Sequence, residues 1–236
     1  MNISIIVPAY NEEKRIAKSL IEIDDFCKNN FENYELIIVD DKSQDNTADV
    51  VSYLKFKNVK VLKNLKNMGK GFSVKEGILQ ARYPLVLFTD SDLPVPLTYL
   101  TEFIGYINQD YDIVIASKYM KSSKADAEIP FDRKIKGAIF RSIVKMFVVR
   151  KFSDTQCGFK LFKTLAAKKI VKYQTRDRFA FDAELLYIAQ KMGYSIREVP
   201  VAWQNKKGSK VSLNDALKML LDVIIISINK LTGRYS

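Results

Sequence analysis

The sequence predicts an α/β fold with a mostly parallel central sheet flanked by helices. Its first half alternates short apolar runs with helical patterns, which is the signature of such a sheet. The chain has 236 residues, 47% of them hydrophobic, which is enough to build a large core. We find no internal repeat and no linker of low complexity. A single domain spanning residues 1–236 is therefore expected, with a functional division between 1–120 and 121–236.

The expected elements follow one another in a regular order. Strands are predicted at residues 4–7, 35–40, 59–62, 85–89 and 112–117. Helices are predicted between them at residues 11–29, 46–56, 69–82 and 96–108. The second half is predicted to contain helices at 133–151, 179–192 and 213–231, a turn at 157–158 and a strand at 195–203. Ligands of open α/β sheets bind beyond the carboxyl ends of the strands, so polar residues at those ends are the functional candidates.

Composition and charge exclude several classes of function. The formal net charge of +11 indicates anionic partners, such as nucleic acid, phosphorylated substrates or a membrane surface. The chain contains no histidine, which excludes His-based triads and His-ligated metal sites. Its two cysteines, Cys27 and Cys157, lie far apart in the sequence and form no metal-ligand pattern, so we expect no disulfide framework. The start of the sequence resembles a buried strand more than a signal peptide, and no apolar run reaches the ~18–20 residues of a spanning helix. We therefore expect no membrane crossing.

One pair of acids suggests a metal site. Asp90-Ser91-Asp92 follows an apolar strand, and its two carboxylates reach one cleft if the strand ends in a turn, which Pro94 and Pro96 favour. Oxygen ligands at this spacing suit Mg²⁺ or Mn²⁺ bridging a diphosphate. The alternative is an aspartate turn or a helix cap without a ligand.

Two other strand ends carry charged residues. Asp40 and Asp41 end the second predicted strand, where a carboxylate can accept hydrogen bonds from a base N–H or a ribose hydroxyl. The alternative, a strand end before an N-capped helix, leaves the two acids unexplained. Lys70 stands between two glycines at the start of a helix, which suits an anion although the spacing is not that of a P-loop. The alternative there is a tight turn with a solvated lysine.

Four segments together carry a family resemblance. They are IIVPAYNEE (5–13), LIIVDDKSQDNT (36–47), NMGKGFSVKEG (67–77) and FTDSDL (88–93). Their order and spacing resemble the family 2 inverting glycosyltransferases, which have a GT-A fold. The resemblance implies that residues 1–120 bind a nucleotide-sugar, a UDP- or GDP-hexose, through Pro8, Ala9, Tyr10, Glu12, Asp40, Asp41, Lys70, Asp90 and Ser91. It also implies that Asp90 and Asp92 hold Mg²⁺ or Mn²⁺, with Asp92 acting in catalysis.

Three segments of the second half narrow the resemblance. DTQCGFK (154–160), FAFDAELL (179–186) and VPVAW (199–203) resemble the dolichyl-phosphate glucosyltransferase subgroup. This implies a hexose, with UDP-glucose as the expected donor, passed with inversion to dolichyl or polyprenyl phosphate bound by residues 121–236. The sequence departs from the pattern at Lys118, where the family often has arginine. It also shows neither the N-terminal anchor of eukaryotic members nor the C-terminal membrane helices of some relatives.

A second pair of acids, Asp182 and Glu184, lies at the start of a predicted helix, where inverting relatives carry an acidic base. A phosphate monoester has a second pKa near ~6, so the acceptor is already a nucleophile at neutral pH and a base is not essential. The alternative for Asp182 is a capping acid or an acid at the edge of the core. Whether Asp182 or Glu184 acts as a base stays open.

Basic residues are expected on the acceptor side. The resemblance places Arg133 where polyprenyl-phosphate transferases hold the acceptor phosphate, and a guanidinium gives bidentate phosphate contact. Lys118, Lys206 and Lys207 are further candidates, against the alternative of a solvated basic face. The pattern at 134–148 is typical of an in-plane membrane helix or of a helix packed on the core. The apolar spacing at 213–231 favours core packing or a homo-oligomer interface, and membrane contact second.

The expected function is therefore a metal-dependent inverting hexosyltransferase, peripheral at the cytoplasmic face of a membrane. One rival is a family 2 enzyme with a saccharide or protein acceptor, which would need Asp182 or Glu184 as a true base. Another is a non-catalytic basic module that binds nucleic acid. Charge alone supports that module, and paired acids at two strand ends would repel a polyanion, so we expect no nucleic-acid partner.

Overall fold

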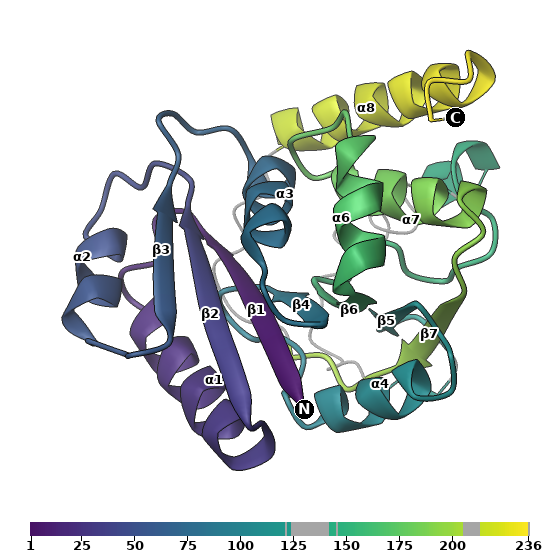
Figure 1. Cartoon of the computed structure of the whole chain (residues 1–236). Helices are drawn as coiled ribbons and strands as arrows, with labels where there is room; N and C mark the ends of the chain where they lie inside the picture. Colours follow the sequence, from purple (N-terminus) through teal and green to yellow (C-terminus); the bar gives the residue numbers. More distant parts are fainter. Residues whose placement is uncertain (121, 124–141, 145, 205–212, 236) are drawn as a thin grey trace.

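The computed structural model describes residues 1–120, 122–123, 142–144, 146–204 and 213–235 (Figure 1). Its strands form one seven-stranded sheet in the order β3-β2-β1-β4-β6-β5-β7. The strands are β1 (Asn2–Ala9), β2 (Asn33–Asp40), β3 (Val59–Lys63), β4 (Leu85–Thr89), β5 (Ile113–Ser117), β6 (Phe159–Lys163) and β7 (Ile196–Pro200). All neighbouring strands pair in parallel except β6, which is antiparallel to both β4 and β5. The predicted α/β fold with a mostly parallel sheet is confirmed.

Helices cover both faces of this sheet. They are α1 (Ile16–Asn30), α2 (Thr47–Tyr53), α3 (Lys70–Gln80), α4 (Tyr99–Ile107), α6 (Thr164–Lys172), α7 (Phe181–Lys191) and α8 (Leu213–Leu231). Successive residues of a strand point to opposite faces, so Ile5 and Ile6 of β1 belong to two different core clusters. One cluster joins the sheet to α1, α2 and α4, and the other joins it to α3, α6, α7 and α8. The central strands read as continuous apolar runs because both of their faces are buried.

Two adjacent elements, β6 and α6, were not predicted from the sequence. Within residues 153–162 only a turn at 157–158 was expected, yet Phe159–Lys163 pairs along the whole of β4. Lys160 interrupts the apolar pattern of this strand, although its side chain is fully buried. The helix α6 follows β6 directly and has no side-chain cap, so no turn or capping signal marks its start. The predicted helix at 213–231 matches α8 at both ends.

The predicted helix at 133–151 lies mostly outside the described residues. Residues 142–144 and 146–147 are helical. Val144 and Val148 are buried in the core, whereas Met146 and Phe147 are exposed. The described part of this segment therefore packs on the core along one side, which is the alternative that the sequence left open.

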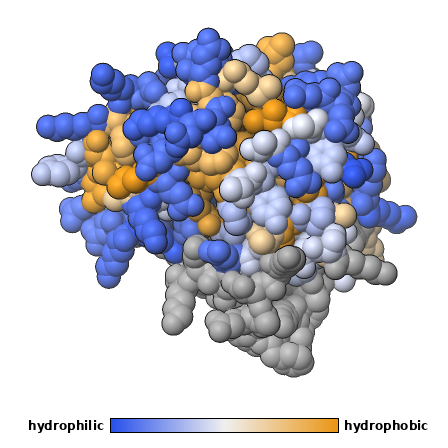
Figure 2. Space-filling model, turned by 90° about the horizontal axis from the view of Figure 1, so that it is seen from below, coloured by the Kyte–Doolittle hydropathy of each residue, from blue (hydrophilic) through white to orange (hydrophobic). Residues whose placement is uncertain are grey.

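The surface and the helices bear on how the protein could meet a membrane. The face seen from below carries mostly hydrophilic side chains, with apolar residues between them (Figure 2). Across the described ranges, no helix combines the length and the apolar character needed to span a bilayer.

Candidate active site

The carboxyl ends of three neighbouring parallel strands meet at one edge of the sheet. β1 pairs in parallel with both β2 and β4, so the loops that follow these strands lie side by side. The backbone N–H of Asp41 donates to the carbonyl of Ala9 at 2.9 Å, which ties the first two loops together. The structure brings to this edge the candidates Pro8, Ala9, Tyr10, Glu12, Asp40, Asp41, Asp90, Ser91 and Asp92.

Each of these three loops holds one residue other than glycine in the left-handed region. The φ angles are 54° at Asn11, 60° at Lys42 and 46° at Leu93. Such conformations cost about 1–3 kcal/mol and persist where surrounding contacts impose them, as at functional sites. Here the N–H of Asn11 donates to Ser43 Oγ at 3.0 Å, and Asn11 Oδ1 accepts from the N–H of Gln44 at 2.7 Å. These contacts fix the first two loops against each other.

Asp90 lies between Lys70 and Gly158. Lys70 Nζ is 2.5 Å from Asp90 Oδ1, and the N–H of Asp90 donates to the carbonyl of Gly158 at 3.1 Å. A Cβ atom at position 158 would lie 2.2 Å from Asp90 Oδ2, so only glycine leaves room for the carboxylate. The side chain of Asp90 is still 29% exposed. The carboxylate is thus held in one direction and remains accessible.

Asp92, the second acid of this strand end, faces Arg15. Arg15 Nη1 lies 3.4 Å from Asp92 Oδ2, and the same guanidinium binds Glu12 through Nε and through Nη2, the latter at 2.9 Å. Burial raises the pKa of Asp92, the like charges of Asp90 and Glu12 add to this shift, and Arg15 opposes it. Two carboxylates therefore share one guanidinium, and the third, Asp90, pairs with Lys70. The three acids outnumber these two cations, which favours the binding of a further cation.

The two acids at the carboxyl end of β2, Asp40 in the strand and Asp41 directly after it, have different partners. Asp41 is buried and accepts hydrogen bonds from the backbone N–H groups of Met68 at 2.8 Å and Gly69 at 2.7 Å. It thereby fixes the loop before α3. Asp40 Oδ1 accepts from the N–H of Ser43 at 3.1 Å. The geometry favours a structural role for Asp41 and leaves Asp40 as the candidate for nucleotide contact.

Lys70 begins α3 and points into the site. Besides its ion pair with Asp90, its Nζ lies 6.0 Å from the ring centroids of both Phe88 and Phe181. Burial works against the charged form, but the charges of Asp90 and Asp182 outweigh it, so the pKa of Lys70 is raised. The position excludes the alternative of a solvated lysine and gives the site a permanent positive charge.

Asp182, on the first turn of α7, forms a buried ion pair with Lys160 of β6. Lys160 Nζ also donates to the carbonyl of Cys157 at 2.9 Å and lies 5.0 Å from the ring centroid of Phe88. Burial raises the pKa of Asp182, whereas Lys160 and Lys70 act in the opposite direction. Asp182 is only 2% exposed. Its carboxylate therefore interacts with the lysines of this network, and its burial disfavours direct contact with a substrate.

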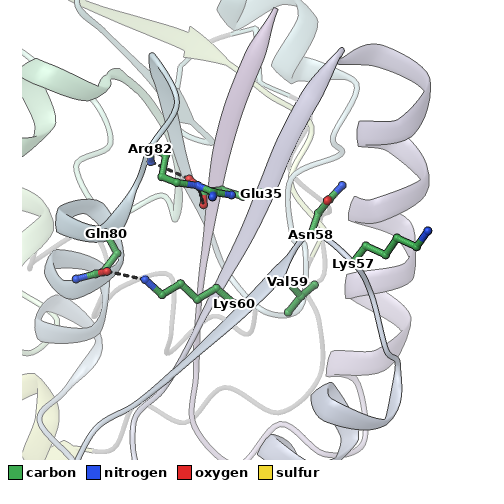
Figure 3. A pocket seen from close by; sticks show the side chains of 7 residues that line it. All are labelled: Glu35, Lys57, Asn58, Val59, Lys60, Gln80 and Arg82. Atoms are coloured by element: carbon green, nitrogen blue, oxygen red, sulfur yellow. Dashed lines mark hydrogen bonds and ion pairs between the residues drawn. The ribbon is translucent and has the colours of Figure 1, made fainter.

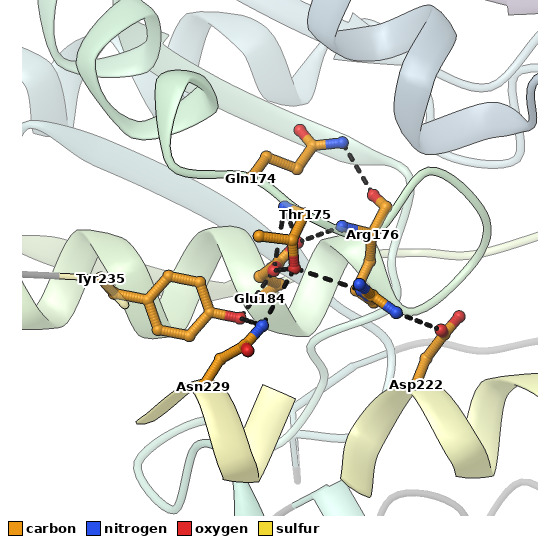
Figure 4. A network of polar contacts seen from close by, with 7 residues as sticks. All are labelled: Gln174, Thr175, Arg176, Glu184, Asp222, Asn229 and Tyr235. Carbon is orange, nitrogen blue, oxygen red and sulfur yellow. Dashed lines mark hydrogen bonds and ion pairs between the residues drawn. The ribbon is translucent and has the colours of Figure 1, made fainter. Parts of the chain in front are cut away.

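Glu184 is fully buried, and its oxygens accept several hydrogen bonds (Figure 4). The donors are the N–H of Thr175 at 3.0 and 3.1 Å, Thr175 Oγ1 at 2.5 Å, the N–H of Arg176 at 2.8 Å and Tyr235 Oη at 2.7 Å. Burial and the hydrogen bond to Glu184 raise the pKa of Tyr235 to about 12, so the phenol stays a donor. Glu184 joins α7 to the turn at 174–176 and to the chain after α8, which favours a structural role over that of a base.

Of the four candidates for the acceptor phosphate, the structure describes Lys118. Its Nζ lies 4.6 Å from a ring centroid of Trp203 and 5.4 Å from that of Tyr119. Burial works against its charge, but Asp154 and neighbouring groups outweigh burial, so the pKa of Lys118 is raised. Arg133, Lys206 and Lys207 lie outside the described residues, and their roles stay predictions.

Sequence reasoning missed three residues that shape the site: Arg15, Gly158 and Lys160. Arg15 follows Glu12 at a spacing that also fits an ordinary helical surface pair. Gly158 was read as part of a turn, and only the structure shows the carboxylate packed against it. Lys160 did carry a signal, a lone charge between Phe159 and Leu161 in an apolar segment, which indicates a paired charge in the core.

The chemistry of Asp90 and Asp92 fits a divalent cation, because carboxylate oxygens are the ligands that Mg²⁺ and Mn²⁺ prefer. In the parts of the chain with assigned positions, no group of three or more acidic, Cys or His side chains could hold a metal ion by itself. Mg²⁺ is usually held by one or two carboxylates together with substrate phosphates. A cation arriving with a diphosphate would relieve the crowding of like charges that raises the pKa of Asp92.

A cavity of about 340 Å³ lies at the opposite edge of the sheet (Figure 3). Glu35, Lys57, Asn58, Val59, Lys60, Gln80 and Arg82 line it. Its buried acid, Glu35, already accepts hydrogen bonds from Ser4 Oγ at 2.7 Å and from Arg82 N and Nε at 2.7 and 2.9 Å. This cavity lies near the amino ends of β2 and β3, away from the loops that carry the candidate residues.

Known proteins match both the sequence and the fold. The family model for glycosyl transferase family 2 matches residues 4–171. A dolichyl-phosphate beta-glucosyltransferase of Trichomonas vaginalis is 36% identical over 96% of this chain and 73% of its own length. The enzymes of the same name from Drosophila melanogaster and Saccharomyces cerevisiae are 36% and 32% identical, over 100% and 99% of this chain and 77% and 76% of their own.

Among solved structures, glucosyl-3-phosphoglycerate synthase from Mycobacterium tuberculosis, in complex with Mn²⁺, uridine diphosphate and phosphoglyceric acid, has a TM-score of 0.70. It is 17% identical, and the match covers 100% of this chain and 78% of that one. At this identity the likeness shows the fold alone, and it confirms the predicted GT-A fold. The sequence matches add the family, and the chain belongs to glycosyl transferase family 2, with dolichyl-phosphate beta-glucosyltransferases among its relatives.

Proposed function

We propose that this glycosyltransferase moves a glucosyl group from UDP-glucose to dolichyl phosphate or another polyprenyl phosphate, with inversion at the anomeric carbon. The observation that carries the proposal is the acid pair at the end of β4, with Asp90 beside Lys70 and Asp92 beside Arg15. Dolichyl phosphate and the glucosyl group are those in the names of relatives that are 31–36% identical over nearly the whole chain, and UDP is our expectation for the nucleotide. The whole chain acts as one catalytic unit, with the donor bound by residues 1–120 and the acceptor by residues 121–236.

The donor binds across the carboxyl edge of the sheet. Pro8, Ala9 and Tyr10 line the nucleotide pocket, and Asp40 accepts hydrogen bonds from the base or the ribose. The diphosphate lies over the ends of β1 and β4, where Lys70 and Arg15 supply positive charge. Asp90 and Asp92 would hold Mg²⁺ or Mn²⁺, and the chemistry that such an ion supplies when bound is neutralisation of the charge on the leaving diphosphate.

The acceptor is its own nucleophile. Its phosphate has a second pKa near ~6 and is largely a dianion at neutral pH. A phosphate oxygen forms the new bond to the anomeric carbon while the bond from that carbon to the β-phosphate oxygen breaks and its electron pair leaves with UDP. Lys118, Arg133, Lys206 and Lys207 are the groups proposed to orient the phosphate. No proton has to be removed, so the chemistry requires no histidine and no general base.

The two buried acids of α7, Asp182 and Glu184, stabilise the residues around the proposed site and do not themselves react. Asp182 holds Lys160 and adds to the field that keeps Lys70 charged. Glu184 fixes the turn at 174–176. A rival function, transfer to a saccharide or protein hydroxyl, needs an accessible base, and both acids are buried and engaged. The reaction belongs at the cytoplasmic face of a membrane, where a protein attached peripherally meets a lipid acceptor.

The test is transfer of labelled hexose by the purified chain in detergent. Dolichyl phosphate and unphosphorylated dolichol are compared as acceptors, each with UDP-glucose or a GDP-hexose and with Mn²⁺ or a chelator. We expect a glucolipid only from UDP-glucose, dolichyl phosphate and the metal together. Transfer to dolichol at a similar rate would contradict the acceptor assignment, and undiminished transfer with the chelator would contradict the metal assignment.

A further inference from the structure

The outer face of α8 carries large apolar side chains that stay exposed. They recur at helical spacing along one side of the helix: Leu221, Ile224, Ile225, Ile228 and Leu231, with exposed fractions between 37% and 85%. The opposite side of α8 buries Val223 and Ile226 in the core. A surface helix normally has a polar outer side, so an apolar side facing outward needs a partner.

The apolar face extends onto the neighbouring segment of the chain. Ser227 Oγ of α8 donates to the backbone carbonyl of Phe147 at 3.4 Å, so the segment of Met146 and Phe147 adjoins the helix. Both side chains are at least half exposed. Fourteen large apolar side chains are exposed among the described residues, and seven of them belong to α8 or to this segment. We call these seven residues the α8 patch, and their concentration separates them from scattered surface residues.

Positive charge borders the α8 patch. Lys218 lies on α8 one turn before Leu221, and Arg234 follows the other end of the helix, both exposed. Lys230 is exposed as well, but its Nζ lies 5.2 Å from the ring centroid of Tyr187, on the side of α8 that packs on the core. The chain as a whole carries a formal net charge of +11. Apolar residues with lysine and arginine at their border match the interface of an anionic bilayer, where each basic residue near the surface contributes about 1 kcal/mol. A second copy of the chain would bring the same basic border against itself, which disfavours self-association through this patch.

We propose that the α8 patch docks the protein on an anionic membrane surface. Sequence patterning favoured residues 134–148 for membrane contact and 213–231 for the core or an oligomer. The patch keeps Met146 and Phe147 of the first segment and adds five residues of α8, which thus carries most of the contact. The inference deepens the proposed function, since a lipid acceptor has to be reached at a bilayer, but the patch can be tested without any transfer reaction.

Contacts connect this patch with the candidate active site. Asp222 of α8 pairs with Arg176, whose Nη1 lies 3.2 Å from Asp222 Oδ1. The turn that contains Arg176 packs on the start of α3: Gln174 Nε2 donates to the carbonyl of Gly71 at 3.0 Å, and the N–H of Phe72 donates to the carbonyl of Asp177 at 2.9 Å. Since α3 begins with Lys70, α8 is joined through the turn at 174–177 to the helix that carries a charge of the site.

The test compares the double variant Ile224→Gln/Ile228→Gln with the wild type and with Leu165→Gln. Leu165 lies on α6 and is 78% exposed, so its replacement is a matched control outside the patch. Binding is measured by flotation with vesicles of phosphatidylcholine, alone or mixed with phosphatidylserine and without acceptor. We expect the double variant to bind mixed vesicles at least about tenfold more weakly, because two apolar side chains lose their transfer into the bilayer. Leu165→Gln should bind like the wild type, and Lys218→Glu should weaken binding to mixed vesicles only.

Transfer assays separate this inference from the proposed function. The double variant should be impaired with dolichyl phosphate embedded in vesicles and normal with a short, water-soluble prenyl phosphate. If neither the wild type nor any variant transfers glucose, the proposed function is contradicted, but the result of the flotation assay still tests the docking proposal. Equal vesicle binding by wild type and double variant would overturn the docking proposal, as would a wild-type dimer that the double substitution converts to a monomer.

Discussion

Two acid pairs with the same spacing have opposite surroundings in this protein. Asp90 and Asp92 follow a strand that ends in a turn, and both remain partly exposed at the sheet edge. Asp182 and Glu184 lie on the first turn of α7, where residues two apart point in different directions. Asp182 faces Lys160, and Glu184 faces Thr175 and Tyr235, with both carboxylates buried. Spacing alone therefore does not identify a catalytic pair, whereas burial and partners do.

The first prediction tests the buried pair on α7, where the largest effect on stability is expected. Lys160→Met alone leaves the Asp182 carboxylate buried without its partner and should lower the free energy of unfolding by about 3–5 kcal/mol. The double variant Lys160→Met/Asp182→Leu removes both charges and should recover most of this loss. Denaturant titration of the wild type, both single variants and the double variant gives a double-mutant cycle, which measures the interaction energy of the pair. A double variant that loses as much as the two single variants added together would contradict a direct pair.

The second prediction sharpens the account of the exposed pair through Gly158. In Gly158→Ala the new methyl group meets the carboxylate of Asp90 and must displace it. Misplacement of a ligand by about 1 Å costs on the order of 10²-fold in rate, so kcat/KM for transfer from UDP-glucose should fall about that much. Gly105→Ala is the matched control, because a Cβ there meets no atom within 4 Å. Similar kinetics for the two variants would show that the position of the Asp90 carboxylate does not affect the rate of transfer.

The third prediction concerns Glu184 as a structural residue. Glu184→Gln keeps the size of the side chain but turns one accepting oxygen into a donor that faces other donors. The free energy of unfolding should fall by about 1–3 kcal/mol, while kcat per folded molecule stays close to that of the wild type. Thermal unfolding and steady-state kinetics on the same preparation separate the two effects. Loss of turnover in a stable Glu184→Gln protein would instead support a base.

The smallest predicted effect is a gain in stability at the exposed pair. Burial, Asp90 and Glu12 raise the pKa of Asp92 in the folded state, so the native state is destabilised as pH rises from the ordinary aspartate pKa to the raised one. At neutral pH and with a chelator, Asp92→Asn should therefore have a higher Tm than the wild type. The difference should shrink below about pH 4, where the unfolded chain also binds the proton. A lower Tm for Asp92→Asn at neutral pH would contradict this account.

Much of the fold and part of the site could be predicted from the sequence. Apolar runs at residues 4–7, 35–40 and 85–89 located three parallel strands, and their shared edge followed from topology. The antiparallel strand β6 was missed because a buried lysine breaks its pattern. The contact partners of the site residues could not be predicted from the sequence. Gly158 and Asp90, for example, are 68 positions apart, and no local sequence pattern indicates that they are in contact.

Metal-dependent binding of UDP-glucose to the wild type, Asp92→Asn and Glu184→Gln is the most direct test of the contrast between the two acid pairs. Calorimetry with and without Mn²⁺ measures it without any acceptor. We predict that Mn²⁺ strengthens binding to the wild type and to Glu184→Gln, and that Asp92→Asn loses this gain while it stays folded. Retention of the full Mn²⁺ effect by Asp92→Asn, or its loss in a folded Glu184→Gln, would contradict the account.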